Sequence, residues 1–255
     1  MAGRSIEESN PLPLYHQLKE LLRSQIEGGE FPVGARLPSE VEIAEEYKIS
    51  RSTVRLAILD LVREGLLYRK QGKGTFVANP KITRGMPGVT SFTEDMKARG
   101  LKPGARVLKF EIAVPPQRVA VSLRLRDKEE AARIERQMLA DDEPIAFHIS
   151  YLPLSVWNAI NIKPEDLNDQ SLFWCLENRA RIVLDEGLET IEVGIADAYV
   201  ASILGIKKGS PVLLLEHLVS SVDGEPVEFA TNFYRGDRYK YYIKHKRQRI
   251  SFMRR

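Results

Sequence analysis

The segment LPSEVEIAEEYKISRSTVRLAILDLVREGLLYRKQGKGTFV, residues 37–77, contains the clearest structural signals in the N-terminal part of the chain. Ser39 is followed three residues later by Glu42, and this spacing predicts a capping box that begins a short helix. A second helix with one apolar face is predicted by residues that recur at helical spacing, namely Val54, Ala57, Ile58, Leu61 and Val62. Two short helices joined by a tight turn predict a helix-turn-helix.

A further helix precedes this pair. Its apolar face is formed by Leu14, Leu18, Leu21, Leu22 and Ile26. Gly28 and Gly29 are expected to end it, and the segment 31–38, with two prolines and a glycine, is expected to form a turn-rich connector.

The residues that follow the second helix of the pair, 66–77, have apolar ends and a basic centre. Gly72 and Gly74 lie in this centre, and glycine permits the backbone conformations of a tight hairpin turn. We therefore expect a two-stranded hairpin with Lys73 at its tip. A basic hairpin directly after a helix-turn-helix is typical of a winged helix-turn-helix.

Basic charge is concentrated on this motif. Residues 48–73 contain 7 Lys and Arg against 2 Asp and Glu, whereas residues 1–47 contain 4 against 9. Recognition helices enter the DNA major groove by their N-terminal end, where base edges and phosphates meet basic and hydroxyl side chains. The polar face of the second helix begins with such residues: Arg51, Ser52, Thr53 and Arg55.

The rest of the composition excludes several classes of protein. The 255 residues are 43% hydrophobic and 29% charged, which is typical of a globular chain long enough for two domains. The single cysteine, Cys175, excludes an internal disulfide framework. No run of about 18 apolar residues and no apolar leader is present, so we expect a cytoplasmic protein without a membrane span.

Beyond residue 88 the pattern changes to alternating strands and short helices. We predict strands at 106–114, 133–140, 145–153, 188–196, 211–222 and 226–235. Helices are predicted at 91–100, 116–124, 154–160, 171–179 and 197–204. The sequences ADDEP (140–144) and VDGEP (222–226) are typical of hairpin turns, so the expected fold class is α+β with an antiparallel sheet.

Motifs for catalysis, metal binding or a cofactor are absent from the sequence. The four histidines, at 16, 148, 217 and 245, form no metal-binding pair, and neither a nucleophile elbow nor a phosphate-binding glycine loop is present. We therefore expect a protein that is not an enzyme and holds no cofactor or metal.

The N-terminal motifs together resemble the GntR family of winged-helix regulators. The resemblance covers residues 11–78 through PLYHQLKELLRSQIEGGEF, LPSEVEIAEEY, ISRSTVRLAILDLVREGLL and QGKGTFV. It implies contacts to double-stranded operator DNA from Arg36, Arg51, Ser52, Thr53, Arg55, Gly72 and Lys73. One position departs from the family pattern: where the family often has a DNA-contacting arginine, this chain has Val41.

The C-terminal part resembles the UTRA effector-binding domain of the HutC subfamily. The motifs TSFTEDMKARGLKPG (90–104), RIERQMLADDEPIAFHISYLP (133–153), LGIKKGSPVLLLE (204–216) and VEFATNFYRGDRYKY (227–241) carry this resemblance. It implies a chorismate-lyase-like fold without enzymatic activity and a pocket for a small molecule. The implied pocket residues are Phe92, Thr93, Arg136, Ser171, Glu228 and Tyr234.

In this resemblance Arg136, with the hydroxyls of Thr93 and Ser171, would bind a phosphate, and Glu228 and Tyr234 would contact sugar hydroxyls. Met138 and His148 replace an arginine and an acid of the sugar-phosphate sensors, so a carboxylate effector is the alternative to a phosphorylated sugar or amino sugar. Other interpretations stay open: Arg136 as a solvated strand residue, and Phe92 and Tyr234 as core aromatics.

We therefore predict a homodimeric repressor that a small anionic metabolite releases from its operator or retargets on it. The expected boundaries are a DNA-binding domain at 1–78, a linker at 79–88, an effector-binding and dimerisation domain at 89–243 and a basic tail at 244–255. Two alternatives remain: a chorismate-lyase-type enzyme fused to a DNA-binding module, and a nonspecific nucleic-acid binder. The second would use the basic residues Lys240, Lys244, Lys246, Arg247, Arg249, Arg254 and Arg255.

Overall fold

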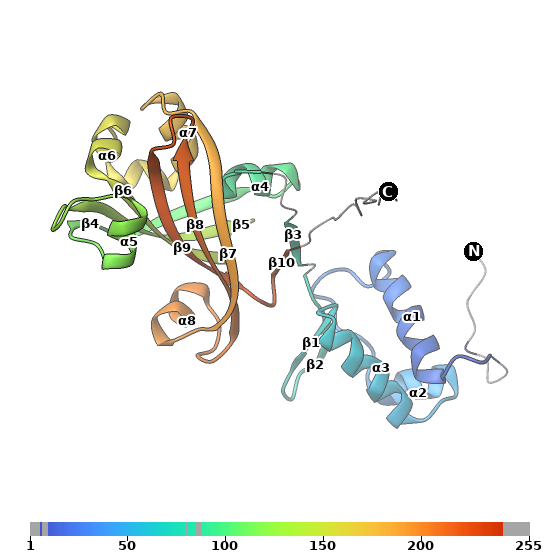
Figure 1. The fold of residues 1–255 in the computed structure, drawn as a ribbon. Coiled ribbons are helices and arrows are strands. Elements are labelled where there is room, and N and C mark those ends of the chain that lie inside the picture. The colour runs from blue at the N-terminus through green and yellow to red at the C-terminus, as the bar shows by residue number, and fades with distance from the viewer. Residues whose placement is uncertain (1–5, 7–9, 80, 85–87, 242–255) are drawn as a thin grey trace, which may run out of the picture. The chain divides into compact units, whose positions relative to one another are not determined.

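A computed structural model of the chain describes residue 6 and residues 10–79, 81–84 and 88–241. The chain divides into two compact units, Met1–Lys81 and Ile82–Arg255 (Figure 1). The predicted basic tail, residues 244–255, lies outside the described residues. None of the helices in the described ranges is long and apolar enough to cross a membrane.

The first unit is a winged helix-turn-helix, as the sequence predicts. Its elements are α1 (Leu14–Glu27), α2 (Glu40–Tyr47), α3 (Arg51–Arg63), β1 (Leu67–Lys70) and β2 (Gly74–Val77). The predicted capping box is present, because Ser39 accepts from the backbone of Glu42 and the Glu42 side chain accepts from the backbone of Ser39. Lys48 adopts a left-handed conformation (φ 54°) that ends α2 and lets α3 begin three residues later.

One apolar cluster holds the three helices and the hairpin together. The apolar stripe predicted for α3 lies at its centre, where Val54, Ala57 and Leu61 are fully buried. Leu18 of α1, Ile43 of α2 and residues of both hairpin strands pack around it. The opposite face of α3 is therefore left at the surface.

In the described part of the second unit, six strands form an antiparallel sheet in the order β4-β5-β6-β9-β8-β7 (Figure 1). The bounds are β4 (Pro103–Ala113), β5 (Ala131–Ala140), β6 (Glu143–Pro153), β7 (Leu184–Ile195), β8 (Pro211–Ser221) and β9 (Pro226–Arg235). Each predicted strand is present, with ends that differ by a few residues. Asp141 and Asp142, both at positive φ, form the tight turn expected between β5 and β6.

Short helices cover both faces of this sheet. On one face lie α4 (Phe92–Ala98), α6 (Leu154–Ile160), the 3₁₀ helix η1 (Pro164–Asn168) and α7 (Leu172–Asn178). On the other lie α5 (Gln117–Ser122) and α8 (Ala198–Leu204). The central strands are thus buried on both sides, with two apolar clusters under each group of helices.

A small parallel pair of strands was not predicted. β3 (Ile82–Arg84) lies within the segment 79–88 that we expected to be a linker, and it pairs with β10 (Tyr239–Tyr241). β10 is in turn fixed to the sheet domain, because the Tyr239 hydroxyl donates to Asp95 of α4 at 2.8 Å and its ring lies 4.3 Å from that of Tyr234.

Candidate functional site

The N-terminal end of α3 presents a group of hydroxyls beside two exposed arginines. Ser50 caps the helix by accepting from the backbone N–H of Thr53 at 3.1 Å, and its hydroxyl lies 2.7 Å from that of Ser52. Arg51, Ser52 and Arg55 are exposed, and Thr53 is half-buried. These side chains occupy the position from which recognition helices contact base edges and phosphates.

The cations of this unit fall into two groups. Lys19, Arg23 and Arg63, on α1 and at the far end of α3, form ion pairs with nearby carboxylates. By contrast, the described residues supply no ion-pair partner for the four basic residues predicted to bind DNA: Arg36, Arg51, Arg55 and Lys73. Unpaired cations gain more from phosphate contacts, because no existing interaction has to be broken.

The hairpin β1–β2 brings Arg36 and Lys73 to this surface. A backbone bond of 2.9 Å from Lys73 to Lys70 closes the turn, in which Gly72 has φ +70°. Arg36 pairs with Phe76 of β2, and its Nε lies so near Gly74 that a Cβ there would come within 2.9 Å of it. Val41 is 38% exposed on α2, so the arginine that it replaces would have faced solvent.

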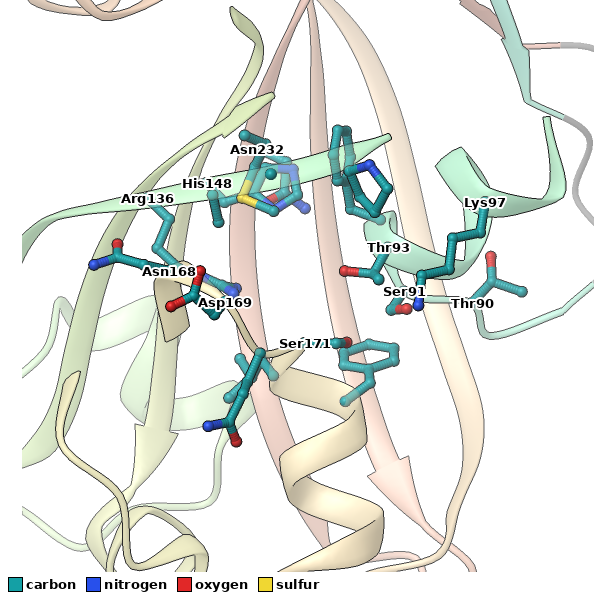
Figure 2. A pocket seen from close by; sticks show the side chains of 18 of the residues that line it. Thr90, Ser91, Thr93, Lys97, Arg136, His148, Asn168, Asp169, Ser171 and Asn232 are labelled. Carbon is teal, nitrogen blue, oxygen red and sulfur yellow. The ribbon is translucent and has the colours of Figure 1, made fainter. Parts of the chain in front are cut away.

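The second unit contains a cavity of about 320 Å³ between the sheet and the helices α4 and α7 (Figure 2). All six residues predicted to line an effector pocket line this one cavity: Phe92, Thr93, Arg136, Ser171, Glu228 and Tyr234. Figure 2 shows Thr90, Ser91, Thr93 and Lys97 on one side of it and Arg136, Asn168 and Asp169 on the other. The cavity is therefore built from segments far apart in the sequence.

Arg136 is a buried cation with unused hydrogen-bond donors. It is 5% exposed, so the interpretation as a solvated strand residue is wrong. Its guanidinium donates to Ser150 Oγ at 3.4 Å, and among the described residues its Nε has no partner. Burial lowers the pKa of Arg136, although the nearby charge of Glu228 opposes this effect. Burying a guanidinium that is only partly hydrogen-bonded costs free energy, and an anion bound beside it offsets that cost.

Glu228 is the buried acid of the cavity, at 2% exposure. Burial favours its neutral form, but the 3.2 Å contact with His217 Nε2 and the charge of Arg136 hold the pKa of Glu228 below its usual value. The carboxylate is therefore ionised at neutral pH and can accept hydrogen bonds from a ligand.

The two departures from the sugar-phosphate pattern also line the cavity. Met138 is 4% exposed and places a thioether where a second arginine would add charge. His148 is 8% exposed, and its Nε2 lies 3.1 Å from the Tyr234 hydroxyl. Tyr234 and Phe92 are both buried in the apolar cluster under α4, so they are core aromatics and cavity residues at once.

The hydroxyls predicted to support Arg136 come from the ends of two helices. Thr93 lies in the first turn of α4, and Ser171 caps α7, where its Oγ accepts from the backbone N–H of Trp174 at 3.4 Å. The Ser171 hydroxyl can still donate its own proton into the cavity. Lys97 of α4, an exposed cation without an ion-pair partner in the described ranges, also lines it.

Sequence reasoning missed several cavity residues: Lys97, Lys102, Asn168, Asp169, Gln170, His217 and Asn232. The strand period of two could have identified Asn232, which lies two residues before Tyr234 on β9 and therefore shares its face. No local pattern could have identified residues 168–170, because they reach the cavity from η1 and the connection to α7.

Comparisons with known proteins give a family match for each of the two units. Residues 14–77 match the family described as bacterial regulatory proteins, gntR family, and residues 98–240 match the UTRA domain. The chain is 39% identical over 237 residues to the HTH-type transcriptional repressor NagR of Bacillus subtilis, covering 93% of this chain and 96% of that protein. It is 31% identical over 210 residues to a histidine utilization repressor of Pseudomonas aeruginosa, covering 80% of each.

Among solved structures, PhnF from Mycobacterium smegmatis is similar with a TM-score of 0.63 and 26% identity. The similarity covers 90% of this chain and 99% of PhnF, so it includes both units and the segment between them.

Proposed function

Because this chain belongs to the GntR family of bacterial regulatory proteins and carries a UTRA domain, we propose that it is a homodimeric repressor whose release from its operator is caused by a small anionic metabolite in the cavity of Figure 2. It is a DNA-binding transcription regulator, as are its relatives, and not an enzyme. It would bind operator DNA in the cytoplasm.

The operator contacts are assigned to the exposed end of α3 and to the hairpin. Arg51, Ser52, Thr53 and Arg55 would meet base edges and phosphates in the major groove, and Arg36, Gly72 and Lys73 would meet the backbone beside it. This is supported by the exposure of Arg51, Arg55 and Lys73 and by the lack of ion-pair partners for them among the described residues.

A homodimer is proposed because one winged helix-turn-helix contacts only a short half-site, and two-fold operators mirror two-fold proteins. The edge strand β7 of the sheet domain offers exposed apolar side chains for this contact, on both faces of the sheet. There Leu188, Val193 and Ile195 are 66%, 81% and 75% exposed. A second copy that covered this edge would remove these apolar side chains from water and pair the free backbone groups of the edge strand.

The observation that carries the effector proposal is the buried guanidinium of Arg136, which faces a cavity with donors unused. A phosphate or a carboxylate at this position would accept those donors, together with the hydroxyls of Thr93 and Ser171. Of the relatives, one is named a repressor of histidine utilization and another a repressor of the transport and metabolism of mannosyl-D-glycerate. A carboxylate and a phosphorylated sugar are both candidate effectors, because the Arg136 guanidinium can bind either kind of anion.

The test combines a stability screen with operator release. Purified protein is screened by thermal shift against phosphorylated sugars and small carboxylates, and each compound that stabilises it is added to a gel-shift assay with operator DNA. A true effector at 100 times its Kd adds about 2.7 kcal/mol of stability and dissociates the complex. If every stabilising compound leaves the operator complex intact, the cavity does not control DNA binding.

A further inference from the structure

Asn232 is a second buried polar group of the cavity with an unused hydrogen-bonding atom. It lies in the middle of β9, lines the cavity and is 2% exposed. Its Oδ1 has no hydrogen-bond partner in the part of the chain that the structure describes. Folded proteins keep few such groups, because a buried carbonyl without a donor has lost its hydrogen bonds to water and gained nothing.

The neighbours of Asn232 do not supply the missing donor. Across the sheet it is opposite His148 of β6 and Leu215 of β8. His148 Nε2 is paired with the Tyr234 hydroxyl, and Leu215 has no polar atom in its side chain. On β9, the carboxylate of Glu228 accepts and cannot donate to another carbonyl. Because Asn232 also lines the cavity, we infer that a bound ligand supplies the donor.

The position of Asn232 relative to Arg136 limits the kind of ligand that could use both. Arg136, His148 and Asn232 are opposite one another on β5, β6 and β9, and Figure 2 shows them in this order along the sheet. Neighbouring strands lie about 4.8 Å apart, so the backbones of Arg136 and Asn232 are separated by roughly 10 Å. A ligand of the size of a hexose spans such a distance between two side chains, whereas a bare phosphate or acetate ion does not.

We propose that Asn232 is a specificity-determining residue of this cavity, whose carboxamide binds an uncharged hydroxyl or amide group at the end of the effector opposite to the anion on Arg136. This inference rests on the proposed function, because it takes the cavity as the effector site. The effector is then an organic anion with hydroxyl or amide groups, such as a sugar phosphate or a sugar acid. A ligand group that donates to this unpartnered carbonyl gains a hydrogen bond without breaking one inside the protein.

The first test distinguishes a role of Asn232 in fold stability from a role in ligand binding. Asn232→Leu keeps a similar volume and removes the polar atoms. We expect the ligand-free variant to have a Tm equal to or above that of the wild type, because an unsatisfied buried carbonyl is removed. A Tm lower by about 4 °C or more would show that Asn232 is a structural residue and would overturn the proposal.

The second test measures binding of matched probes to the full-length protein by titration calorimetry. Glucose 6-phosphate and glucosamine 6-phosphate are each compared with inorganic phosphate, and gluconate with acetate. We expect at least one hydroxylated anion to bind the wild type tenfold or more tightly than its bare anion. Asn232→Leu should remove this preference and leave affinity for the bare anion unchanged.

Thr231→Val is the matched control, because Thr231 is the neighbouring residue on β9 and lies on the opposite face of the sheet. It should keep the wild-type preference. The inference fails if no probe is preferred over its bare anion, or if Asn232→Leu keeps the preference. Arg136→Ala distinguishes failure of this inference from failure of the proposed function. If the Arg136→Ala protein binds every probe like the wild type, the cavity is not the effector site.

Discussion

Arg51 and Arg55 on α3 are exposed, whereas Arg136 on β5 is 5% exposed, and the described residues give none of the three an ion-pair partner. The physical consequences differ. Water solvates an exposed arginine, so leaving it unpaired costs little, and many such residues can each contribute a modest, salt-sensitive attraction to DNA. A buried arginine has lost that water, so its interaction with a bound anion is strong and depends on a single residue.

We therefore expect the surface of α3 and the cavity of the sheet domain to respond differently to the loss of one positive charge. Removal of a cation from the DNA-binding unit should weaken operator binding gradually. Removal of the buried cation from the sheet domain should abolish the response to the effector.

The largest effect is expected for Arg136→Ala. The variant should lose effector affinity by about 100-fold, since the anion then loses its buried guanidinium partner, a loss of roughly 2–3 kcal/mol. Operator affinity should stay within twofold of the wild type, because the residue lies in the other unit. Calorimetry measures the first quantity and a gel-shift titration the second.

Arg106→Ala is the control for this prediction, because Arg106 is an exposed arginine on the neighbouring strand β4. It should respond to effector like the wild type. Normal release of the Arg136→Ala protein by its inducer would mean that the effector binds elsewhere.

A smaller effect is expected for Arg51→Ala or Arg55→Ala. Each should weaken specific operator binding by about 1–3 kcal/mol, because each loses contacts to base edges or phosphates, while effector binding is unchanged. Arg63→Ala at the other end of α3, where Arg63 pairs with Asp60 at 3.3 Å, provides the comparison. Equal gel-shift curves for Arg63→Ala and Arg51→Ala would contradict the orientation of α3 on DNA proposed here.

The chemical class of the anion is tested by Met138→Arg, which adds a second guanidinium to the cavity. A phosphate has enough acceptor oxygens and charge for two arginines, so phosphorylated sugars should bind about tenfold tighter. A small carboxylate should gain nothing or bind more weakly. Circular dichroism of the variant must match the wild type, because Met138 is buried.

Lys73→Ala should have a still smaller and less selective effect. We expect operator and random DNA to lose affinity equally, and the slope of log affinity against log salt to fall by about one, because one phosphate contact is lost. A loss confined to one operator variant would identify Lys73 as a base-reading residue instead.

The smallest effect concerns pH. Since the folded protein holds the pKa of Glu228 below its unfolded value of about 4.3, this group stabilises the fold above that pH, and the contribution is lost as pH falls through the folded pKa. Between pH 6 and pH 3, Glu228→Gln should therefore lose less stability than the wild type. Urea unfolding at both pH values measures the difference, and identical losses would mean that the Glu228 carboxylate is not stabilised in the fold.

Several features of the fold were predictable because they depend on residues close in the sequence. The Ser39–Glu42 capping box and the α3 stripe are local patterns of three or four residues, and both are present. The six strands were found from alternation and turn residues. The pair β3–β10 was not, because three-residue strands are too short to show a period and their partners lie more than 150 residues apart.

The residues of the candidate sites also differ in whether the sequence could predict them. Arg51 and Arg55 could be assigned to an exposed face from helical spacing alone. By contrast, Arg136 and Glu228 were identified as candidate site residues only through the resemblance to a family. Nothing in the sequence near Asn232 indicates that its Oδ1 lacks a donor, because that depends on strands β6 and β8 beside it.

A winged helix-turn-helix with an exposed basic helix, and an α+β domain with an antiparallel sheet, could be predicted without the structure. These follow from local periodicity, caps and turns, which act within a few residues. The folded structure was needed to see that Arg136 and Asn232 line one cavity, and that each has a buried polar atom without a partner among the described residues. The physical reason is that burial and hydrogen-bond satisfaction are set by strand order and register, which join segments nearly a hundred residues apart.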